Sequence, residues 1–295
     1  MRAVPGILAL SLAFVLVQAG PADATPAGPG GRILVLDDSA GGHGVVSVRA
    51  RGGDVRSLGL HLPAYAYPDY SPDGRRVTYA DSWSVYTVKA DGTDRQWVLD
   101  GPYVPAHPRW SPDGTEVGFE AVDIWAGAVA APAGRQVYTV TGRGSLTFDW
   151  SPDGRQIAVV QVWEVGDPWD PINARDIWIA RSDGSMIARR LTDRAETWDP
   201  YRIAWSPNGR TLAVEALGDL WSIDVRTGAM TNLTATADVI ESSPIWSPDG
   251  RLLAFGRQAA GATTPQVWLR PAQSRGDTGR GVGITGIPTS WHRGF

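Results

Sequence analysis

Five copies of one pentapeptide divide this chain into repeats, and no other feature of the sequence constrains the fold as strongly. An aromatic residue followed by Ser-Pro-Asp-Gly, or by Ser-Pro-Asn-Gly in one copy, occurs at 70–74, 110–114, 150–154, 205–209 and 246–250. The aromatic residues are therefore 40, 40, 55 and 41 positions apart. Repeats of this length with strand-like contents are typical of a β-propeller, in which each repeat forms one sheet.

Each repeat carries the pattern of a four-stranded sheet. The pentapeptide is followed by a strand-like run, as at 75–80 and 210–215, and then by a second short run around an aromatic residue, as at 123–127 and 219–223. A turn and a weaker strand come next, most clearly at 181–192. Together with the segment that leads into the aromatic residue, these runs predict four strands in each repeat.

The pentapeptide itself has the composition of a tight turn. Proline presets its own φ, Asp or Asn hydrogen-bonds to the local backbone, and Gly accepts the positive φ that a hairpin turn requires. One repeat replaces Asp with Asn208 and keeps the pattern, so we interpret these carboxylates as turn residues and not as metal ligands or catalytic groups. They are Asp73, Asp113, Asp153 and Asp249. The preceding aromatic ring is expected to fill the wedge between neighbouring sheets.

The two ends of the repeat region complete one another. Residues 31–59 contain three predicted strands without an inner one, and residues 286–295 supply a lone inner strand with Trp291 in the aromatic position. Pairing these fragments closes a ring and leaves no exposed sheet edge. The sequence therefore predicts an all-β, six-bladed β-propeller of four-stranded blades that occupies residues 33–295 as one domain.

The N-terminal segment has the composition of a secretory signal peptide. Residues 1–24 combine Arg2, an apolar run over 7–17 and a small-residue Ala-Asp-Ala ending, which predicts cleavage before Thr25. The alternative is an uncleaved membrane anchor, for which the apolar run is short. Residues 25–32 are expected to form a flexible leader. We thus expect an exported protein, secreted or in the cell envelope, that is monomeric and has no membrane span after cleavage.

Composition narrows the range of partners. The chain has 295 residues, a formal net charge of -4, no basic block and no cysteine. Because phosphate backbones are bound by clustered Lys and Arg, no nucleic-acid partner is expected. The absence of cysteine excludes disulfides, a lipid-modified cysteine and a cysteine nucleophile.

The repeat unit, with its W-S-P-D-G, its D-[IL]-W and its later D-G and L-T, resembles the WD-like repeats of the TolB propeller family, which the propellers of prolyl oligopeptidases share. The resemblance covers residues 33–292. It implies a six-bladed, non-catalytic propeller of the periplasm that binds protein partners. TolB proteins carry an α/β domain before the propeller, whereas only a few residues separate the expected cleavage site from the first strand here.

No catalytic or metal-binding pattern emerges from the remaining residues. The four histidines, His43, His61, His107 and His292, have no ligand spacing, and there is no G-x-S-x-G nucleophile motif. An alternative is that three histidines meet at the mouth of the ring and hold a metal, as in propeller lyases. We expect no cofactor, no metal and no catalytic residues.

The loops opposite the pentapeptide turns differ from repeat to repeat, and variable loops on a rigid frame commonly carry binding. The distance from the pentapeptide Ser to the aromatic residue of the third strand is 15, 14, 27, 15 and 21 residues in successive repeats. The third full repeat therefore contains an insertion at 163–174, on the variable face beside a Trp-Asp-Pro at 198–200. The proposed partner-binding surface consists of Trp163, Glu164, Asp167, Trp169, Asp170, Trp198, Asp199, Tyr67 and Tyr103.

Other interpretations of these residues remain open. Trp163 and Trp169 could pack on the blade edge, the aspartates beside proline could cap turns, and Glu164, Asp167 and Asp170 could bind calcium, although no loop motif supports a calcium site. At the level of function, we expect a non-catalytic scaffold that binds a protein or peptide. The alternative is a carbohydrate-active enzyme, a lyase or glycosidase, with its site at the central mouth.

Overall fold

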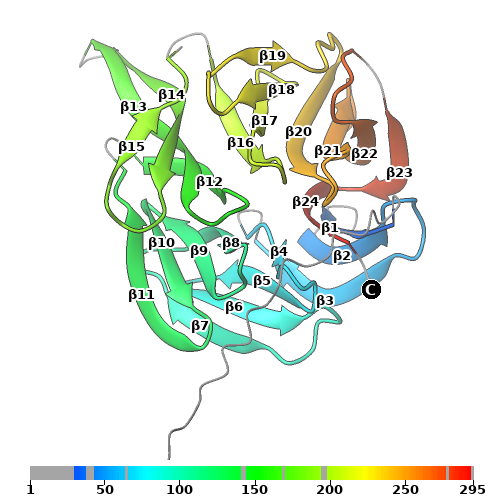
Figure 1. The fold of residues 1–295 in the computed structure, drawn as a ribbon. Helices are drawn as coiled ribbons and strands as arrows, with labels where there is room; N and C mark the ends of the chain where they lie inside the picture. Colours follow the sequence, from blue (N-terminus) through cyan, green and yellow to red (C-terminus); the bar gives the residue numbers. More distant parts are fainter. Residues whose placement is uncertain are drawn as a thin grey trace, which may run out of the picture.

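The computed structural model describes residues 30–37, 43–63, 66–140, 144–167, 170–193, 198–276 and 279–293. In these residues, 24 strands form six four-stranded antiparallel sheets that surround a common axis (Figure 1). The predicted signal peptide at 1–24 and most of the predicted leader at 25–32 lie outside the described residues. No helix that could span a membrane occurs in the ranges given above.

Each sheet is a propeller blade, and we number the blades along the chain and give the innermost strand first. Blade 1 contains β24 (Ile287–His292), β1 (Arg32–Asp37), β2 (His43–Arg49) and β3 (Arg56–Leu62). Blade 2 contains β4 (Asp69–Tyr70), β5 (Arg76–Asp81), β6 (Ser84–Lys89) and β7 (Gln96–Asp100). Blade 3 contains β8 (Ala106–Trp110), β9 (Glu116–Ala121), β10 (Asp123–Ala128) and β11 (Ala131–Tyr138).

The second half of the ring repeats this order. Blade 4 contains β12 (Gly144–Trp150), β13 (Gln156–Asp167), β14 (Asp170–Arg181) and β15 (Ala188–Arg190). Blade 5 contains β16 (Pro200–Trp205), β17 (Thr211–Ala216), β18 (Asp219–Asp224) and β19 (Met230–Asn232). Blade 6 contains β20 (Val239–Trp246), β21 (Leu252–Ala259), β22 (Gln266–Pro271) and β23 (Arg280–Thr285). The six inner strands contact one another around the axis, so they line the central channel.

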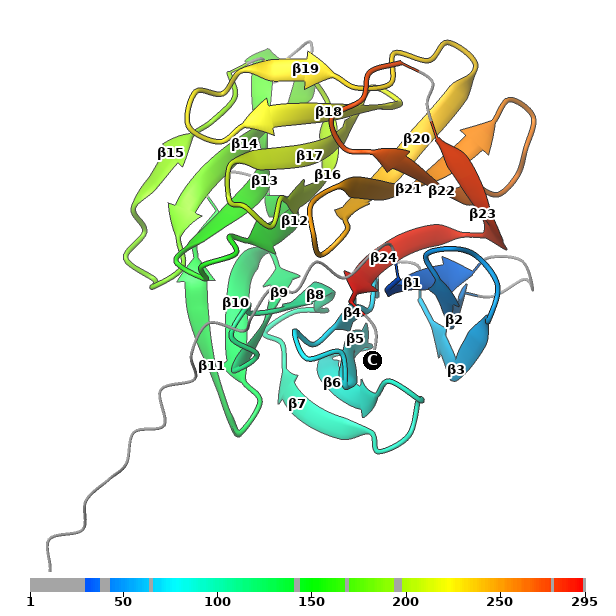
Figure 2. The ribbon, with the colours of Figure 1, turned by 45° about the vertical axis from the view of Figure 1, so that its right-hand side comes forward.

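The ring closes as the sequence predicts. The last strand, β24, pairs antiparallel with the first, β1, and places Trp291 opposite Ile33 and Ile287 opposite Leu36. Blade 1 is therefore built from both ends of the described chain, and Figure 2 shows β24 lying beside β1. Because β1 begins at Arg32, the propeller begins one residue before the predicted boundary at 33.

The pentapeptides form the expected turns. In blade 2, the Ser71 hydroxyl donates to Asp73 Oδ1 at 2.6 Å, and the same oxygen accepts the backbone N–H of Arg75 at 3.0 Å. Gly74 follows with φ +69°. In blade 5, Asn208 Oδ1 accepts from the Ser206 hydroxyl at 2.8 Å and replaces the carboxylate in the same geometry. The interpretation of these aspartates as turn residues is thus confirmed.

The hydrophobic core lies in the wedges between blades. One cluster joins Ile177 and Ile179 of blade 4 to Val214 and Trp205 of blade 5, all at most 6% exposed. The pentapeptide tryptophans Trp110 and Trp150 are similarly buried at the inner ends of other wedges. The aromatic position of the repeat therefore fills the space between sheets, as expected from its size.

The propeller has two faces, which we name by their turns. The pentapeptide face carries the turns between the first and second strands of each blade and those between the third and fourth. The variable face carries the turns between the second and third strands and the connections from one blade to the next. The described residues of the connections on this face are 63, 66–68, 101–105, 139–140, 191–193, 198–199 and 233–238.

The insertion in blade 4 is a β-hairpin and not the loop that was expected. Strands β13 and β14 each have 12 residues and pair continuously from Gln156 and Arg181 to Asp167 and Asp170. The extra residues continue the antiparallel ladder beyond the blade because they pair Trp163 with Ala174 and Val165 with Ile172. Figure 1 shows β13 and β14 as the long green strands at the upper left. The hairpin places backbone, in a fixed register, on the variable face.

Candidate functional site

Five polar residues hold one equivalent position in successive inner strands, four residues before the pentapeptide Ser. They are Tyr67, His107, Thr147, Arg202 and Ser243. The inner strands change register at or beside this position in blades 3 to 6. Such bulges bend a strand and redirect a side chain. The five residues form a ring of mixed chemistry at the variable-face end of the channel, and we call it the channel layer.

His107 in the channel layer is paired with a carboxylate. Its Nδ1 lies 2.7 Å from Glu120 Oε2, and the residues are 8% and 5% exposed. Burial lowers the pKa of His107, which the negative charge of Glu120 partly counters and the positive charge of Arg202 reinforces. The imidazole is therefore neutral at pH 7. With its Nδ1–H donated to Glu120, Nε2 is a buried acceptor with no hydrogen-bond partner among the described residues.

The side chain of Arg202 extends across the central channel. Its guanidinium lies over the ring of Tyr67 at 3.8 Å and over that of Tyr201 at 4.9 Å. Tyr67 in turn contacts His107 edge to face, with ring centroids 4.9 Å apart. Blades 2 and 5 are diametrically opposed in a six-bladed ring, so this cation–π contact spans the channel. Nε and Nη1 of Arg202, which is 5% exposed, have no acceptor in the described part of the chain.

A second polar layer lies two residues closer to the pentapeptides. Arg109 Nη1 donates to the Thr289 carbonyl at 2.8 Å and lies 3.6 Å from Asp69 Oδ1. Asp69 and Asp149 accept the backbone N–H groups of Trp110 and Trp205 in the following blades, at 2.9 and 2.6 Å. These bonds tie neighbouring inner strands together, which gives this layer a structural role.

The pKa values of the two carboxyl groups in the second layer are raised. Burial raises the pKa of Asp69, against the opposing effect of Arg109. Burial also raises the pKa of Asp149 to about 6, again against Arg109 and with a further contribution from Asp69. Two carboxylates thus share one guanidinium in a desolvated space, which disfavours ionisation of both at once.

Most large apolar side chains that are exposed lie on the variable face. Eleven such residues occur in the part of the chain that the structure describes, and seven of them lie in turns, connections or strand starts of this face. We call these seven the apolar rim. Its members are Trp83, Tyr103, Val104, Val122, Tyr201, Leu217 and Ile240. They come from blades 2, 3, 5 and 6 and from the connection between blades 2 and 3, so they lie on two opposite sides of the channel.

Two rim residues occupy backbone conformations that do not favour them. Leu217 has φ +56° in a two-residue turn with Gly218, and Val122 has φ +71° in a turn of one residue between paired Ala121 and Asp123. Residues with a Cβ disfavour this region, and β-branched residues most of all. Apolar side chains are therefore presented to solvent at positions where Gly or Asn would be more stable.

The structure separates the predicted surface into residues that are accessible and residues that are not. Tyr103 belongs to the apolar rim and is 58% exposed. Asp199 is exposed and pairs with Arg175 Nη1 at 2.5 Å, at the base of the blade 4 hairpin. Trp163 is half-buried, and the guanidinium of Arg190 covers its ring at 4.8 Å. Tyr67 is half-buried and belongs to the channel layer.

Trp198 does not belong to the surface, which corrects the prediction. It is 4% exposed and packs edge to face on Trp221, with ring centroids 5.0 Å apart. The connection turns inward at this point and fills the wedge between blades 4 and 5. Trp169 lies outside the described residues, as do the side chains of Glu164, Asp167 and Asp170.

Two groups of functional candidates were missed from sequence. The channel layer has a signal, because a polar residue recurs at one repeat position in five of the inner strands. Glu120 and Glu215 share another repeat position, nine residues after the pentapeptide Ser, where the remaining blades have Ala80, Val160 and Gly256. The apolar rim has a weaker signal, which is the presence of Leu217 and Val122 in turns.

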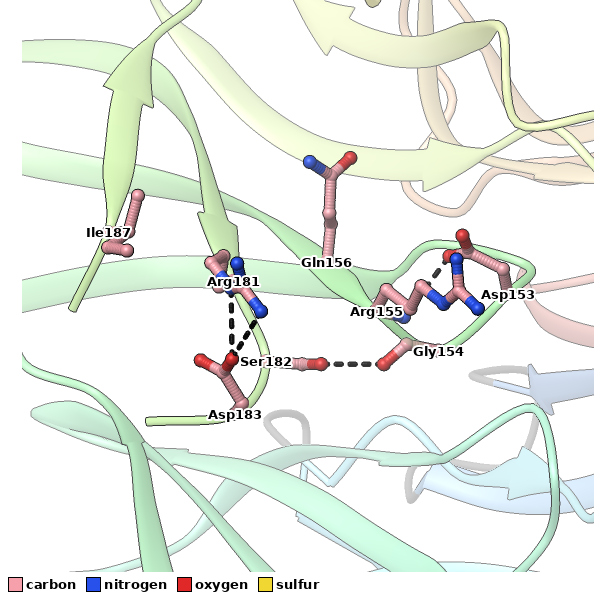
Figure 3. Close-up of a pocket in the computed structure, with 8 residues that line it drawn as sticks. All are labelled: Asp153, Gly154, Arg155, Gln156, Arg181, Ser182, Asp183 and Ile187. Carbon is pink, nitrogen blue, oxygen red and sulfur yellow. Dashed lines mark hydrogen bonds and ion pairs between the residues drawn. The ribbon is translucent and has the colours of Figure 1, made fainter. Parts of the chain in front are cut away.

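The pentapeptide face has hollows, and several polar groups in the one shown in Figure 3 bond to one another. This hollow of about 810 Å³ lies between two turns of blade 4. Arg181 pairs with Asp183 at 2.7 Å, and the Ser182 hydroxyl donates to the Gly154 carbonyl at 2.6 Å. We therefore assign no function to it.

No group of three or more potential metal ligands occurs in the described ranges. His107 lies in the inner strand of blade 3, while His61 lies exposed in the outer strand of blade 1. Shared coordination of one ion by these two histidines is thus not supported by their positions in the fold.

Comparison with solved structures identifies the fold. TolB from Acinetobacter baumannii superposes with a TM-score of 0.67 at 16% identity, over 89% of this chain and 66% of that one. A putative TolB from Agrobacterium tumefaciens gives 0.67 at 19% identity, over 88% and 92%. A chain of a nidogen/laminin complex gives 0.65 at 10% identity, over 89% and 98%. This chain is a TolB-like six-bladed β-propeller in fold, as its repeats predicted.

Sequence relatives have diverse names. The uncharacterized peptidase YuxL of Bacillus subtilis is 26% identical over 64% of this chain, and dipeptidyl-peptidase 5 of Porphyromonas endodontalis is 22% identical over 63%. The Tol-Pal system protein TolB of Anaeromyxobacter dehalogenans is 27% identical over 59%. The chain spans only 28%, 36% and 42% of the lengths of these curated relatives. No protein-family model matches the sequence.

Proposed function

We propose that this protein is an exported, non-catalytic propeller that binds a protein or peptide partner through its variable face. The observation that carries the proposal is the apolar rim, because seven of the eleven exposed large apolar side chains among the described residues lie on the variable face, on two opposite sides of the channel. Exposed apolar groups concentrated on one face are typical of interaction surfaces.

The polar centre of this face complements its rim. The hydrogen-bonded His107–Glu120 pair and a cross-channel cation–π contact are held in place at the channel layer, and His107, Glu120 and Arg202 are nearly inaccessible to solvent. A partner would thus contact aromatic and aliphatic side chains around a rigid polar centre, an arrangement that protein interfaces commonly use. Arg175, Asp199 and Tyr201 connect the base of the blade 4 hairpin to this centre.

Two further observations support a binding role in an exported protein. The fold is shared with TolB proteins and with a chain of a nidogen/laminin complex, which is an assembly of proteins. The N-terminal 24 residues have the composition of a signal peptide. Export follows from this segment, and mass spectrometry of the mature protein should find Thr25 at its N-terminus.

A rim variant tests the proposal. Tyr103→Ser, Leu217→Asn and Ile240→Thr together replace three exposed apolar side chains and leave the blades unchanged. Proteins captured from the cell envelope or culture fluid by the wild type should be lost or strongly reduced with this variant. The matched control is Val55→Thr with Ile187→Thr, which removes exposed apolar groups from the pentapeptide face. Equal recovery with the rim variant and the wild type would contradict the proposal.

The second candidate is a carbohydrate-active enzyme that works at the channel mouth. The observation that favours it is the buried His107–Glu120 pair, in which Nε2 is an acceptor oriented by a carboxylate, as a general base requires. Purified protein would be incubated with a panel of polysaccharides, with and without divalent metal. Turnover that His107→Ala abolishes would replace the binding proposal with this one.

A further inference from the structure

Two departures from the repeat occur at the same seam of the ring. The pentapeptide of blade 2 begins with Tyr70, whereas the other four copies begin with Trp. At the C-terminal end, His292 follows Trp291, where every pentapeptide has Ser after its aromatic residue. Both residues lie between blades 1 and 2 on the pentapeptide face, and their ring centroids are 5.9 Å apart.

A cavity has formed at this seam. It has a volume of about 720 Å³ and extends between Tyr70 and Gly74 of blade 2 and the end of β24. The hollow between blades 3 and 4, where Trp150 takes the place of Tyr70, has a volume of about 290 Å³. Tyrosine fills less of the wedge than tryptophan. The volume at the seam lies within the range of small-molecule sites, about 300–1,000 Å³.

The fixed cations of the cavity are Arg32 and Arg76, which have equivalent contacts in the two blades. Arg32 donates to Ser47 and Asp54, including a 2.8 Å bond to Asp54 Oδ2. Arg76 donates to Thr87 and Asp94, including a 3.0 Å bond to Asp94 Oδ2. Their hydrogen-bonding capacity is used within each blade, so they form the rigid wall.

Two other cations are only loosely paired. Arg75 Nε lies 4.0 Å from Asp73 Oδ2, and Lys89 Nζ lies 3.7 Å from Asp94 Oδ2. Both distances exceed those of hydrogen bonds, and both side chains are largely exposed. Lys89 is the chain's single lysine, since the 27 basic residues include 26 arginines. Arg75 and Lys89 can therefore donate to a ligand without breaking a structural bond.

Charge at the seam opposes that of the whole protein. Its lining contains five cations and two carboxylates, and the partners Asp54 and Asp94 leave a net charge of +1. The whole chain has a net charge of -4. A cationic hollow in an anionic protein attracts anions selectively.

We propose that this cavity is a binding site for a sugar-sized anion, with a ring against Tyr70 and a phosphate or carboxylate held by Arg75 and Lys89. Arginine and lysine are the side chains that bind these groups best, and Tyr70, which is 8% exposed, contributes to the wall against which a sugar ring would lie. The site is separate from the partner surface of the variable face, so it does not depend on the proposed function.

A ligand in this cavity would also stabilise the contact between blades 1 and 2, where the propeller closes. It would contact both blade 1, including the end of β24, and blade 2. Binding to the folded state alone raises the melting temperature in proportion to the logarithm of ligand concentration. Thermal stability therefore reports occupancy of the cavity, whichever anion is the natural ligand.

The test uses glucose 6-phosphate and galacturonate as anionic probes, with glucose as the neutral control. Each anionic probe is titrated against melting temperature, and an amine-reactive reagent measures modification of Lys89. At least one anion should raise the melting temperature and protect Lys89 at concentrations at which glucose does neither. A response to the phosphate alone or to the carboxylate alone identifies the group that the site prefers. No response to either anion, or an equal response to glucose, overturns the proposal.

Two variants locate the effect. Tyr70→Trp restores the repeat residue, fills the cavity and should abolish the response. If that variant does not fold, Arg75→Gln provides the same test on the surface, with at least a tenfold loss of affinity expected. The matched control is Arg251→Gln, because Arg251 occupies the same repeat position in blade 6 and lies 3.9 Å from Asp249. Equal loss in Arg251→Gln and Arg75→Gln would contradict a site at the seam.

Discussion

Asp149 provides a quantitative test of the polar layers in the channel. Its pKa is raised from 3.8 to about 6 because the carboxylate is desolvated between inner strands and lies near the like charge of Asp69, effects that the positive charge of Arg109 opposes only in part. A shift of this size corresponds to about 3 kcal/mol of differential stability between the protonated and ionised states. Replacement of Asp149 by Asn removes the ionisation and should remove this contribution.

The sign follows from proton uptake. Between pH 3.8 and 6 the folded state keeps a proton on Asp149 that the unfolded state has released. Each rise in pH within this window therefore favours unfolding. The wild type should lose about 3 kcal/mol of unfolding free energy relative to Asp149→Asn as pH rises from about 4 to above 6.

The variant also has a cost that does not depend on pH. The two carboxylate oxygens of Asp149 accept from different backbone N–H groups, those of Trp150 and Trp205. A carboxamide has one oxygen and retains one of these bonds, so the variant loses about 1 kcal/mol or more at every pH. The change with pH, and not the absolute difference, is therefore the informative quantity.

Urea unfolding of both proteins at intervals from pH 3.5 to 7 measures this change. Asp113→Asn is the control, because hydrogen bonding to Ser111 and the Thr115 backbone lowers the pKa of Asp113. The stability that Asp113 contributes is present above its unfolded pKa and is lost as pH falls, so its curve has the opposite slope. A difference between wild type and Asp149→Asn that stays constant from pH 4 to 6.5 would refute the buried-charge account.

Three further predictions concern the frame and the rim. Deletion of residues 287–295 removes β24 and leaves β1 as an open edge, so the melting temperature should fall sharply; an unchanged value would contradict ring closure. Trp198→Ala should lower the unfolding free energy by about 3–5 kcal/mol in urea, since the indole fills an interior wedge; a loss below about 1 kcal/mol would place Trp198 at the surface instead. Leu217→Asn creates Asn-Gly in a two-residue turn and should raise the unfolding free energy by about 1 kcal/mol while it weakens partner capture; lower stability would show that Leu217 serves packing.

The strands, turns and ring closure could be predicted from the sequence because the blades repeat the same kinds of turn residues and the same core positions. The pentapeptide turns need Ser, Asp or Asn, and Gly at fixed offsets, and the wedges need a large ring before them. Ring closure followed from two incomplete fragments, since a sheet without its inner strand has an unsatisfied edge. The turn requirements are local and the core requirements recur with the repeat, so a single sequence is enough to recognise them.

The residues of the candidate site were harder to predict, because the path of a connection between blades decides which of its side chains are exposed. Trp198 and Asp199 are neighbours in one Trp-Asp-Pro, yet the first is buried against Trp221 and the second is exposed and paired with Arg175. Nothing in their composition distinguishes an indole that fills a wedge from one that faces solvent. The insertion in blade 4 was located correctly, but its ladder was not expected, since short alternating runs also occur in loops.

The channel layer illustrates what periodic reasoning can still recover. Its residues differ in chemistry from blade to blade, although they occupy the same position of the repeat. Tyr70 and His292 at the seam are departures of the same kind. In a repeat protein the uniform positions build the scaffold, and the positions that depart from the pattern are the first candidates for function.

Hydrogen exchange of the protein with and without its captured partner tests the central claim most directly. We predict that the partner slows exchange in the variable-face segments 82–84, 101–105, 217–219 and 239–241, and that the pentapeptide turns at 71–75 and 247–251 are unchanged. Protection confined to the pentapeptide turns, with no change in the variable-face segments, would contradict the proposal that this propeller binds its partner through the apolar rim.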